Sequence, residues 1–202
     1  MRTKTIKIDP KNPDLALIAK AAKIIKDGGL VAFPTETVYG LGASYFDKKA
    51  VERIYKIKKR PKNKPLSLHV DDFGVLNELN CDVTPQAGQV ISRFWPGPLT
   101  IILKSKDNQK GVGFRMPRNR IARLLIKRSG VPIVAPSANL SGNKPPRNAG
   151  DVKRDLDGKI DMIIDAGEVE LGVESTVLDL SGAKSKILRE GAIADAVRQF
   201  LK

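Results

Sequence analysis

Short apolar segments of β-type composition recur along this sequence, and they restrict the folds open to it. Most are a few residues long and are bounded by glycine, proline or small polar residues, as strands are and long helices are not. The run LTIIL at residues 99–103 is among the longest, and it is far too short to span a bilayer. We therefore predict strands at residues 3–8, 30–33, 66–70, 100–103, 112–116, 133–135, 162–164, 176–180 and 187–189.

Helical periodicity occupies several of the intervals between these strands. Asn12 followed by Pro13 is typical of a helix start, so a helix is predicted from there to Asp27, ended by Gly28 and Gly29. Its predicted inner face consists of Leu15, Ile18, Ala22 and Ile25. Further helices are predicted at residues 47–59, capped by Asp47, and at residues 120–128 and 192–201.

The predicted strands outnumber the helices and do not alternate with them strictly. This order favours a mixed, twisted β-sheet flanked by helices over a purely doubly wound fold, that is, an α/β (α+β) class. The sequence has no internal repeat, low-complexity tract or linker, so we expect one domain over residues 1–202.

The chain carries 36 Lys and Arg residues against 22 Asp and Glu, a net charge of +14. Such an excess favours an anionic partner such as a nucleotide or nucleic acid, although a basic surface that serves only solubility gives the same count. The single thiol, Cys81, cannot form an intramolecular disulfide, and the N-terminus lacks the apolar core of a signal peptide. We expect a cytoplasmic protein with no membrane segment.

Polar loops adjoin the predicted strands, which is where α/β sheets usually hold their ligands. The segments PTETVYGLG (residues 34–42) and VAPSANLSG (134–142) supply hydroxyls, an amide and glycines, GVESTVLDL (172–180) leads into a strand, and Arg189 ends the last strand. From local composition, each segment fits a plain turn or a helix cap about as well as a binding loop.

A basic segment at residues 53–64 holds seven basic residues in 12 and no acid. Arginine can bind phosphate in bidentate fashion and lysine acts as a mobile point charge, so Lys58 and Arg60 suit a triphosphate, although they also complement the dipole of the helix they leave. The only histidine, His69, has no neighbouring nucleophile, and there is no Gly-x-Ser-x-Gly elbow, Walker A loop or G-x-G-x-x-G. These residues predict a basic, hydroxyl-rich cleft for a phosphorylated ligand.

The ordered series of motifs resembles the YrdC-like family of threonylcarbamoyl-adenylate synthases, in its single-domain form. The motifs are PTETVYGLG, K-x-R-P with PLSLHV, WPGPLT, VGFRMP, SANLSG, GVESTV and LREGAI, in that order along nearly the whole chain. The resemblance implies a twisted mixed sheet with a large basic cavity. Lys59 stands within K-x-R where a small residue is expected.

The resemblance also implies roles for particular residues. It assigns ATP binding to Lys58, Arg60, Ser137, Asn139 and Arg189, with Lys58 and Arg60 also catalytic. It assigns threonine binding to Thr35, His69, Arg115 and Ser175, while Thr37 and Tyr39 of the first loop cannot be ranked against Thr35.

The implied reaction converts L-threonine, bicarbonate and ATP with Mg²⁺ into threonylcarbamoyl-AMP and pyrophosphate for tRNA modification, and a downstream threonylcarbamoyl transferase complex would use the product. Because the attacking carbamate is already anionic, positioning and charge neutralisation should matter more than a strong base. Two alternatives stay open. One is a module that binds tRNA or double-stranded RNA without catalysis, and the other is a carbamoyltransferase that forms a carbamoyl-adenylate from carbamoyl phosphate.

Overall fold

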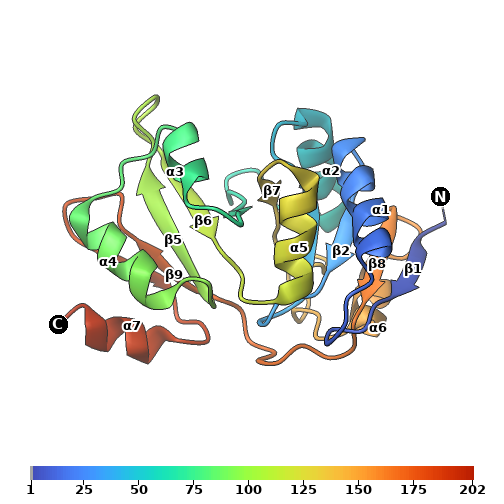
Figure 1. Cartoon of the computed structure of the whole chain (residues 1–202). Helices are drawn as coiled ribbons and strands as arrows, with labels where there is room; N and C mark the ends of the chain where they lie inside the picture. Colours follow the sequence, from blue (N-terminus) through green and yellow to red (C-terminus); the bar gives the residue numbers. More distant parts are fainter. Residues whose placement is uncertain (1) are drawn as a thin grey trace.

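All the predicted strands join one mixed sheet in the computed structural model, which describes residues 2–202 (Figure 1). Its order from edge to edge is β1-β8-β2-β3-β7-β4-β6-β5-β9-β10. The strands are β1 (Lys4–Lys7), β2 (Val31–Phe33), β3 (Gly40–Ser44), β4 (Leu68–His69), β5 (Leu99–Lys104), β6 (Gly111–Arg115), β7 (Ile133–Val134), β8 (Met162–Asp165), β9 (Thr176–Asp179) and β10 (Lys186–Arg189). Parallel pairs such as β1–β8 and β5–β9 occur beside antiparallel pairs such as β2–β3 and β5–β6, so the predicted fold class is confirmed.

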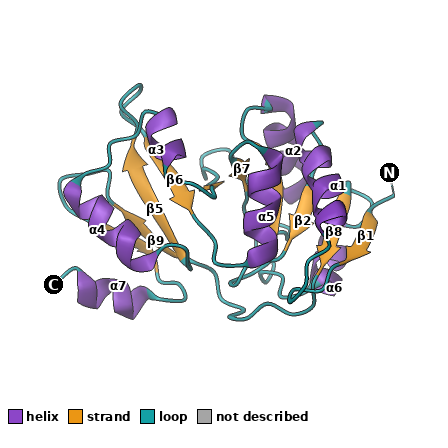
Figure 2. Ribbon diagram, in the orientation of Figure 1, coloured by secondary structure: helices purple, strands orange, loops and turns teal. Residues whose placement is uncertain are grey.

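Helices cover both faces of this sheet (Figure 2). They are α1 (Leu15–Lys26), α2 (Lys48–Lys58), α3 (Gly74–Glu78), α4 (Pro85–Phe94), α5 (Arg120–Ser129), α6 (Ala149–Leu156) and α7 (Ala194–Phe200). Side chains alternate along a strand, so Val31 and Phe33 of β2 pack with α1 and α5, while Ala32 faces the opposite core that includes α2 and α6. None of the helices within residues 2–202 has the length and hydrophobicity needed to cross a bilayer.

Two of the strands at the centre of the sheet are very short. β4 and β7 have two residues each, and they join the β1–β3 end of the sheet to the β5, β6, β9 and β10 end. Figure 1 shows these ends as two wide regions, one with the N-terminus, α1 and α5 and the other with α4, α7 and the C-terminus.

The predicted start of the first helix was wrong. Asp14, not Asn12, is the N-cap, and its Oδ1 accepts hydrogen bonds from the backbone N–H groups of Ala16 and Leu17 at 2.8 and 3.1 Å. Leu15, predicted to face inward, is the first residue of the helix and has an exposed fraction of 48%. The other predicted inner residues are buried, and the helix ends at Lys26 with Asp27 as its C-cap, close to the prediction.

Two more predictions needed correction. The strand predicted at residues 66–70 is reduced to β4, and the loop predicted at residues 34–42 ends earlier because Gly40–Ser44 forms β3. Gly42 packs against the Phe33 ring, which leaves little room for a side chain, so the glycines that suggested a loop are needed for close packing in a strand. The helices α3, α4 and α6 were not predicted.

Candidate functional site: a basic cleft at the centre of the sheet

A polar cleft with a volume of ≈ 80 Å³ opens at the short central strands. It receives side chains from segments far apart in the sequence. The predicted site residues that line it are Thr35, Arg60, His69, Arg115, Ser137, Ser175 and Arg189. Lys58 and Asn139 are not among its lining residues and lie behind one of its walls. The structure therefore brings most of the predicted ligand residues together.

Strand register places His69 beside Arg115. β4 and β6 are parallel, with His69 paired to Arg115, so both side chains lie on one face of the sheet. Burial, reinforced by the positive charge of Arg115, holds the pKa of His69 well below its ordinary value. The imidazole is therefore neutral, and its Nδ1 has no hydrogen-bond partner within residues 2–202. A neutral imidazole with an unpaired nitrogen can bind a hydroxyl or amine but cannot contribute charge.

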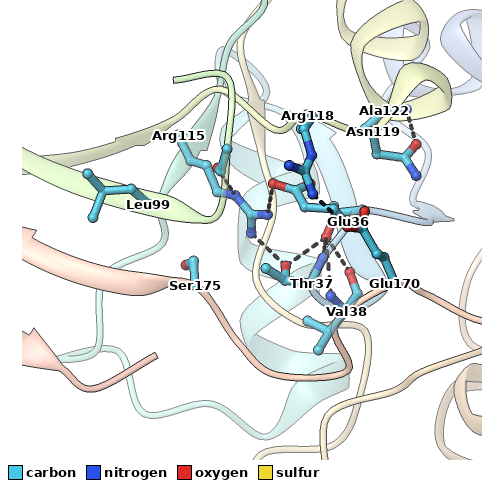
Figure 3. A network of polar contacts seen from close by, with 12 residues as sticks. Glu36, Thr37, Val38, Leu99, Arg115, Arg118, Asn119, Ala122, Glu170 and Ser175 are labelled. Carbon is cyan, nitrogen blue, oxygen red and sulfur yellow. Dashed lines mark hydrogen bonds and ion pairs between the residues drawn. The ribbon is translucent and has the colours of Figure 1, made fainter. Parts of the chain in front are cut away.

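The loop between β2 and β3 holds Arg115 from behind (Figure 3). The guanidinium donates from Nη1 to Thr37 Oγ1 at 2.8 Å and from Nε to the Gly97 carbonyl at 3.3 Å, and its Nη2 lies 2.8 Å from Glu36 Oε1. Thr35 Oγ1 lies 2.8 Å from Thr37 Oγ1, so the predicted ligand Thr35 is linked to Arg115 through one hydroxyl. The loop that was read as a source of hydroxyls also fixes an arginine.

Arg189 is held on the other side of the cleft by the segment before β9. It donates from Nε to the Ser175 carbonyl at 2.9 Å, from Nη2 to Ser175 Oγ at 2.9 Å and from Nη1 to Glu174 Oε1 at 3.0 Å. Ser175 Oγ also lies 2.8 Å from Thr100 Oγ1. Burial lowers the pKa of Arg189 from its ordinary value, and the charge of Glu174 opposes that effect. Two predicted ligands, one assigned to ATP and one to threonine, are thus in direct contact.

Arg60 reaches the cleft from the loop after α2. Its Nε donates to the Lys64 carbonyl and its Nη2 to the Pro65 carbonyl, both at 3.0 Å, which folds the loop back on itself. Lys59 just before it is the left-handed C-cap of α2, with φ of 52°. This left-handed residue ends the helix and turns the chain so that Arg60 lies at the cleft.

Lys58 is buried, with an exposed fraction of 2%, and contacts the segment that forms one wall of the cleft. Its ammonium donates to the Ser137 and Asn139 carbonyls and, at 3.3 Å, to Asn139 Oδ1. Burial, together with the charge of Arg60, lowers the pKa of Lys58 from 10.5 to about 8. Asn139 Oδ1 also accepts a hydrogen bond from Ser137 Oγ at 2.7 Å. Lys58 and Asn139 therefore hold the loop that presents Ser137.

Several residues that build the site were not predicted. Glu36, Thr100, Glu174 and Asp155 were not named, and Thr37 was named but not ranked. Glu36 and Glu174 lie within PTETVYGLG and GVESTV, so an acid inside an otherwise hydroxyl-rich motif was the available signal. Asp155 lies on α6, outside every motif, and accepts hydrogen bonds from the backbone N–H of Leu140 and the side chain of Asn143. Its role depends on a tertiary contact that no local pattern reveals.

The cleft lining is cationic, with three arginines against the single carboxylate of Glu174. Arg60, Arg115 and Arg189 are converging donors that can bind phosphate and carboxylate oxygens. The neutral His69 is the only imidazole, and no lining serine is paired with it as nucleophile and base among the described residues. The geometry suits reactions in which anionic groups are positioned and their charge is neutralised.

A larger, mostly apolar groove lies on the opposite face of β4 and β7. Its volume is ≈ 800 Å³, and Leu68 and Val134 line it with the exposed aromatic side chains of Tyr45 and Phe46. His69 of β4 and Ala135, the residue just after β7, follow them in the chain and line the polar cleft instead. Because the groove contains none of the predicted site residues, the smaller polar cleft is the candidate site.

Comparison with known proteins identifies relatives over most of the chain. Residues 23–191 match the family model Sua5_yciO_yrdC, which is described as "Telomere recombination". The "Threonylcarbamoyl-AMP synthase" of Pyrococcus abyssi is 46% identical over 181 residues, which cover 86% of this chain and 53% of that protein. The "Putative threonylcarbamoyl-AMP synthase" of Methanocaldococcus jannaschii is 35% identical over 201 residues, 96% of this chain and 95% of that protein. The chain spans about half the length of several of the curated relatives it matches.

A solved structure extends this similarity to three dimensions. The chain matches a crystal structure of P. abyssi Sua5 complexed with L-threonine with a TM-score of 0.89 and 44% sequence identity, covering 94% of this chain and 58% of that one. The fold predicted from the motifs is thus shared with a relative of known structure. Since the family model covers residues 23–191 and relatives well above 30% identity align over most of its length, the chain belongs to the Sua5/YciO/YrdC family.

Proposed function

We propose that this chain is an L-threonylcarbamoyladenylate synthase, a nucleotidyltransferase that converts L-threonine, bicarbonate and ATP into threonylcarbamoyl-AMP and pyrophosphate. One observation carries the proposal: the central cleft gathers three arginines, a neutral histidine and serine and threonine hydroxyls from separate segments. Relatives named as threonylcarbamoyl-AMP synthases, and a relative crystallised with L-threonine, support it.

The proposed mechanism begins with the carbamate, which the threonine amine and bicarbonate form with loss of water. A carbamate oxygen attacks the α-phosphorus of ATP. The bond between the α-phosphorus and the oxygen that bridges it to the β-phosphorus breaks, and pyrophosphate leaves with the electron pair of that bond. Mg²⁺ enters as part of the substrate, bound to the phosphates of ATP. The attacking oxygen is already anionic, so the arginines act by orienting two anions and offsetting their repulsion. No strong base is required, in keeping with the lowered pKa of His69, which makes its imidazole a weak base.

The proposed subsites follow the two sides of the cleft. Arg60, Ser137 and Arg189 would bind the nucleotide, with Lys58 and Asn139 holding the loop of Ser137 in place. Threonine would be held by the predicted set of Thr35, His69, Arg115 and Ser175. The contact between Arg189 and Ser175 would then couple the two subsites, because each ligand would bind a residue that touches the other.

Pyrophosphate release with mass detection of the adenylate tests the proposal directly. The purified chain is given MgATP, bicarbonate and L-threonine, and each is omitted in turn. We expect release that needs all three. Release with carbamoyl phosphate in place of threonine and bicarbonate would indicate the carbamoyltransferase reaction. A folded protein that binds tRNA or double-stranded RNA and releases no pyrophosphate would indicate the binding module.

Arg60→Ala should lower the turnover in this assay by at least about tenfold, because it removes one charge-assisted phosphate contact. The matched control is Lys62→Ala, which removes an exposed cation of the same segment that pairs with Glu52 outside the cleft. Equal turnover in the two variants would remove Arg60 from the mechanism.

A further inference from the structure

Glu36 is a buried carboxylate at the back of the cleft, with an exposed fraction of 3%. Its Oε1 lies 2.8 Å from Nη2 of Arg115, and both side chains are almost fully buried. This contact is an ion pair and not a hydrogen bond, because no N–H of Arg115 Nη2 points at the Glu36 oxygen with hydrogen-bond geometry. Neither carboxylate oxygen has a hydrogen-bond partner among residues 2–202. Glu36 is therefore an acid held in the interior by one guanidinium.

Stability alone does not account for such a pair. Removing a carboxylate and a guanidinium from water is costly, and an ion pair without further hydrogen bonds recovers that cost poorly. Well-packed apolar residues would stabilise the same position as well or better. The neighbouring pair of Arg118 and Glu170 lies at the surface, so its charges keep their contact with water and no comparable desolvation cost arises (Figure 3). A buried pair with this geometry points to a requirement of the cleft.

The contacts of Arg115 indicate what that requirement is. Adjacent residues of one loop engage its two terminal nitrogens, Thr37 at Nη1 and Glu36 at Nη2, and the Gly97 carbonyl engages Nε. Three contacts at three nitrogens fix the plane of the guanidinium. A guanidinium has five N–H donors, so donors remain for an anion in the cleft that Arg115 lines.

We propose that Glu36 is a positioning residue that fixes the Arg115 guanidinium for the carboxylate of the amino-acid substrate. The inference rests on the proposed function and assigns to Glu36 a part in amino-acid binding rather than in nucleotide binding. Glu36 lines a separate pocket of ≈ 240 Å³ and does not line the cleft itself. Its effect must therefore pass through Arg115.

Glu36→Gln keeps the size of the side chain and removes its charge, and the sign of its effect separates two roles. If Glu36 positions the guanidinium, part of the binding energy of threonine is used to orient Arg115 in the variant, and the KM for L-threonine rises at least about tenfold. The KM for MgATP stays within about twofold. If Glu36 only neutralises Arg115, the uncompensated cation attracts the substrate carboxylate more strongly, and the KM for L-threonine falls.

The matched control is Glu170→Gln, which removes an exposed carboxylate from the neighbouring ion pair and should leave both KM values unchanged. Glu36→Asp keeps the buried charge with one methylene less, so it should fold even if Glu36→Gln fails to fold. Its KM for L-threonine should lie between those of the wild type and the glutamine variant. Circular dichroism checks folding, and calorimetric titration with L-threonine repeats the comparison without turnover.

The two proposals fail in different ways. A wild-type chain that makes no adenylate contradicts the proposed function. An active wild type beside a folded Glu36→Gln or Glu36→Asp variant with unchanged or lower KM for L-threonine overturns the positioning role alone. An equal rise in the KM for L-threonine and for MgATP overturns it as well, because it would indicate general damage to the cleft.

Discussion

Lys58 differs from the cleft arginines in what surrounds its charge. Its ammonium is directed at carbonyl oxygens of the Ser137–Asn139 segment, and it is among the largest fully buried side chains of the protein. The sequence resemblance assigns it to ATP and to catalysis. Its geometry adds a structural function, because a buried cation on two carbonyls sets where Ser137 stands. Loss of activity in a Lys58 variant would therefore not by itself show contact with ATP.

The buried charge of Lys58 makes stability depend on pH. The pKa is about 8 in the folded chain and near 10.5 when unfolded, so between these values the unfolded state binds more protons and the free energy of unfolding rises with pH. The destabilisation that comes from burying the charged ammonium is fully present below pH 8. It disappears above pH 10.5, the pKa of the unfolded chain. From pH 7 to 9.5 the wild type should gain about 2 kcal/mol relative to Lys58→Met.

Urea unfolding of both proteins at several pH values measures this difference. Taking the difference cancels the titration of all the groups that the two chains share. A gap between wild type and Lys58→Met that stays constant from pH 7 to 9.5 would mean that Lys58 keeps an ordinary pKa in the folded protein.

At the scale of elements, α6 supports the loop of residues 137–143, which carries Ser137, through one residue. Asp155 is buried and accepts hydrogen bonds from the Leu140 N–H at 2.8 Å and from Asn143 Nδ2 at 3.0 Å. Because both partners are donors, Asp155→Asn would face one of them with an amide N–H. We expect a loss of about 1–3 kcal/mol in the free energy of unfolding, and a higher KM for MgATP because the loop carrying Ser137 loosens.

Asp157→Asn is the control, since Asp157 is an exposed acid just beyond the end of the same helix. Chemical denaturation gives the stability of both variants, and the pyrophosphate assay gives their KM for MgATP. If Asp155→Asn matches Asp157→Asn in both, α6 does not support the loop.

Element type was easier to predict from the sequence than the position of element ends. β-Branched and apolar runs predicted most strands because burial against a core selects those residues wherever the strand lies. The start of α1 was wrong because Asn12 and Asp14 are both good caps, and the buried Pro13 between them adds a packing preference that the local sequence does not display. β3 was missed because its glycines serve packing against Phe33.

The candidate site could be predicted from the sequence where a residue lies in a recognisable motif. The family resemblance that those motifs carry assigned Arg115 and His69 to the site, and the β4–β6 register brings them together. Glu36 and Asp155 act by holding other residues, and such roles depend on tertiary contacts. The role of Lys58 also depends on tertiary contacts. Its charge suggested that it binds phosphate, and only the structure shows that it is buried against backbone carbonyls.

At the scale of the molecule, one hydrophobic core crosses the narrow centre of the sheet. It contains Ala32 and Ile163 from the β1–β3 end and Leu99 and Phe114 from the β5–β6 end, and a second core lies only under α1 and α5. The two wide regions of Figure 1 therefore share buried surface although the strands between them are short. Neither region can unfold without exposing part of the shared core.

This shared core predicts that the chain unfolds in one transition. Trp95, the only tryptophan, is buried at the β5 end and donates to the Leu99 carbonyl at 2.7 Å, so its fluorescence reports on that end. Ile163→Ala, at the far end, should lower the free energy of unfolding by about 2–5 kcal/mol. In urea, the Trp95 fluorescence and the far-ultraviolet circular dichroism of this variant should shift together, because a cooperative unit transmits a local loss to every probe. A Trp95 transition that stays in place while the dichroism moves would show instead that the two ends fold as separate units and that the cleft between them is a joint.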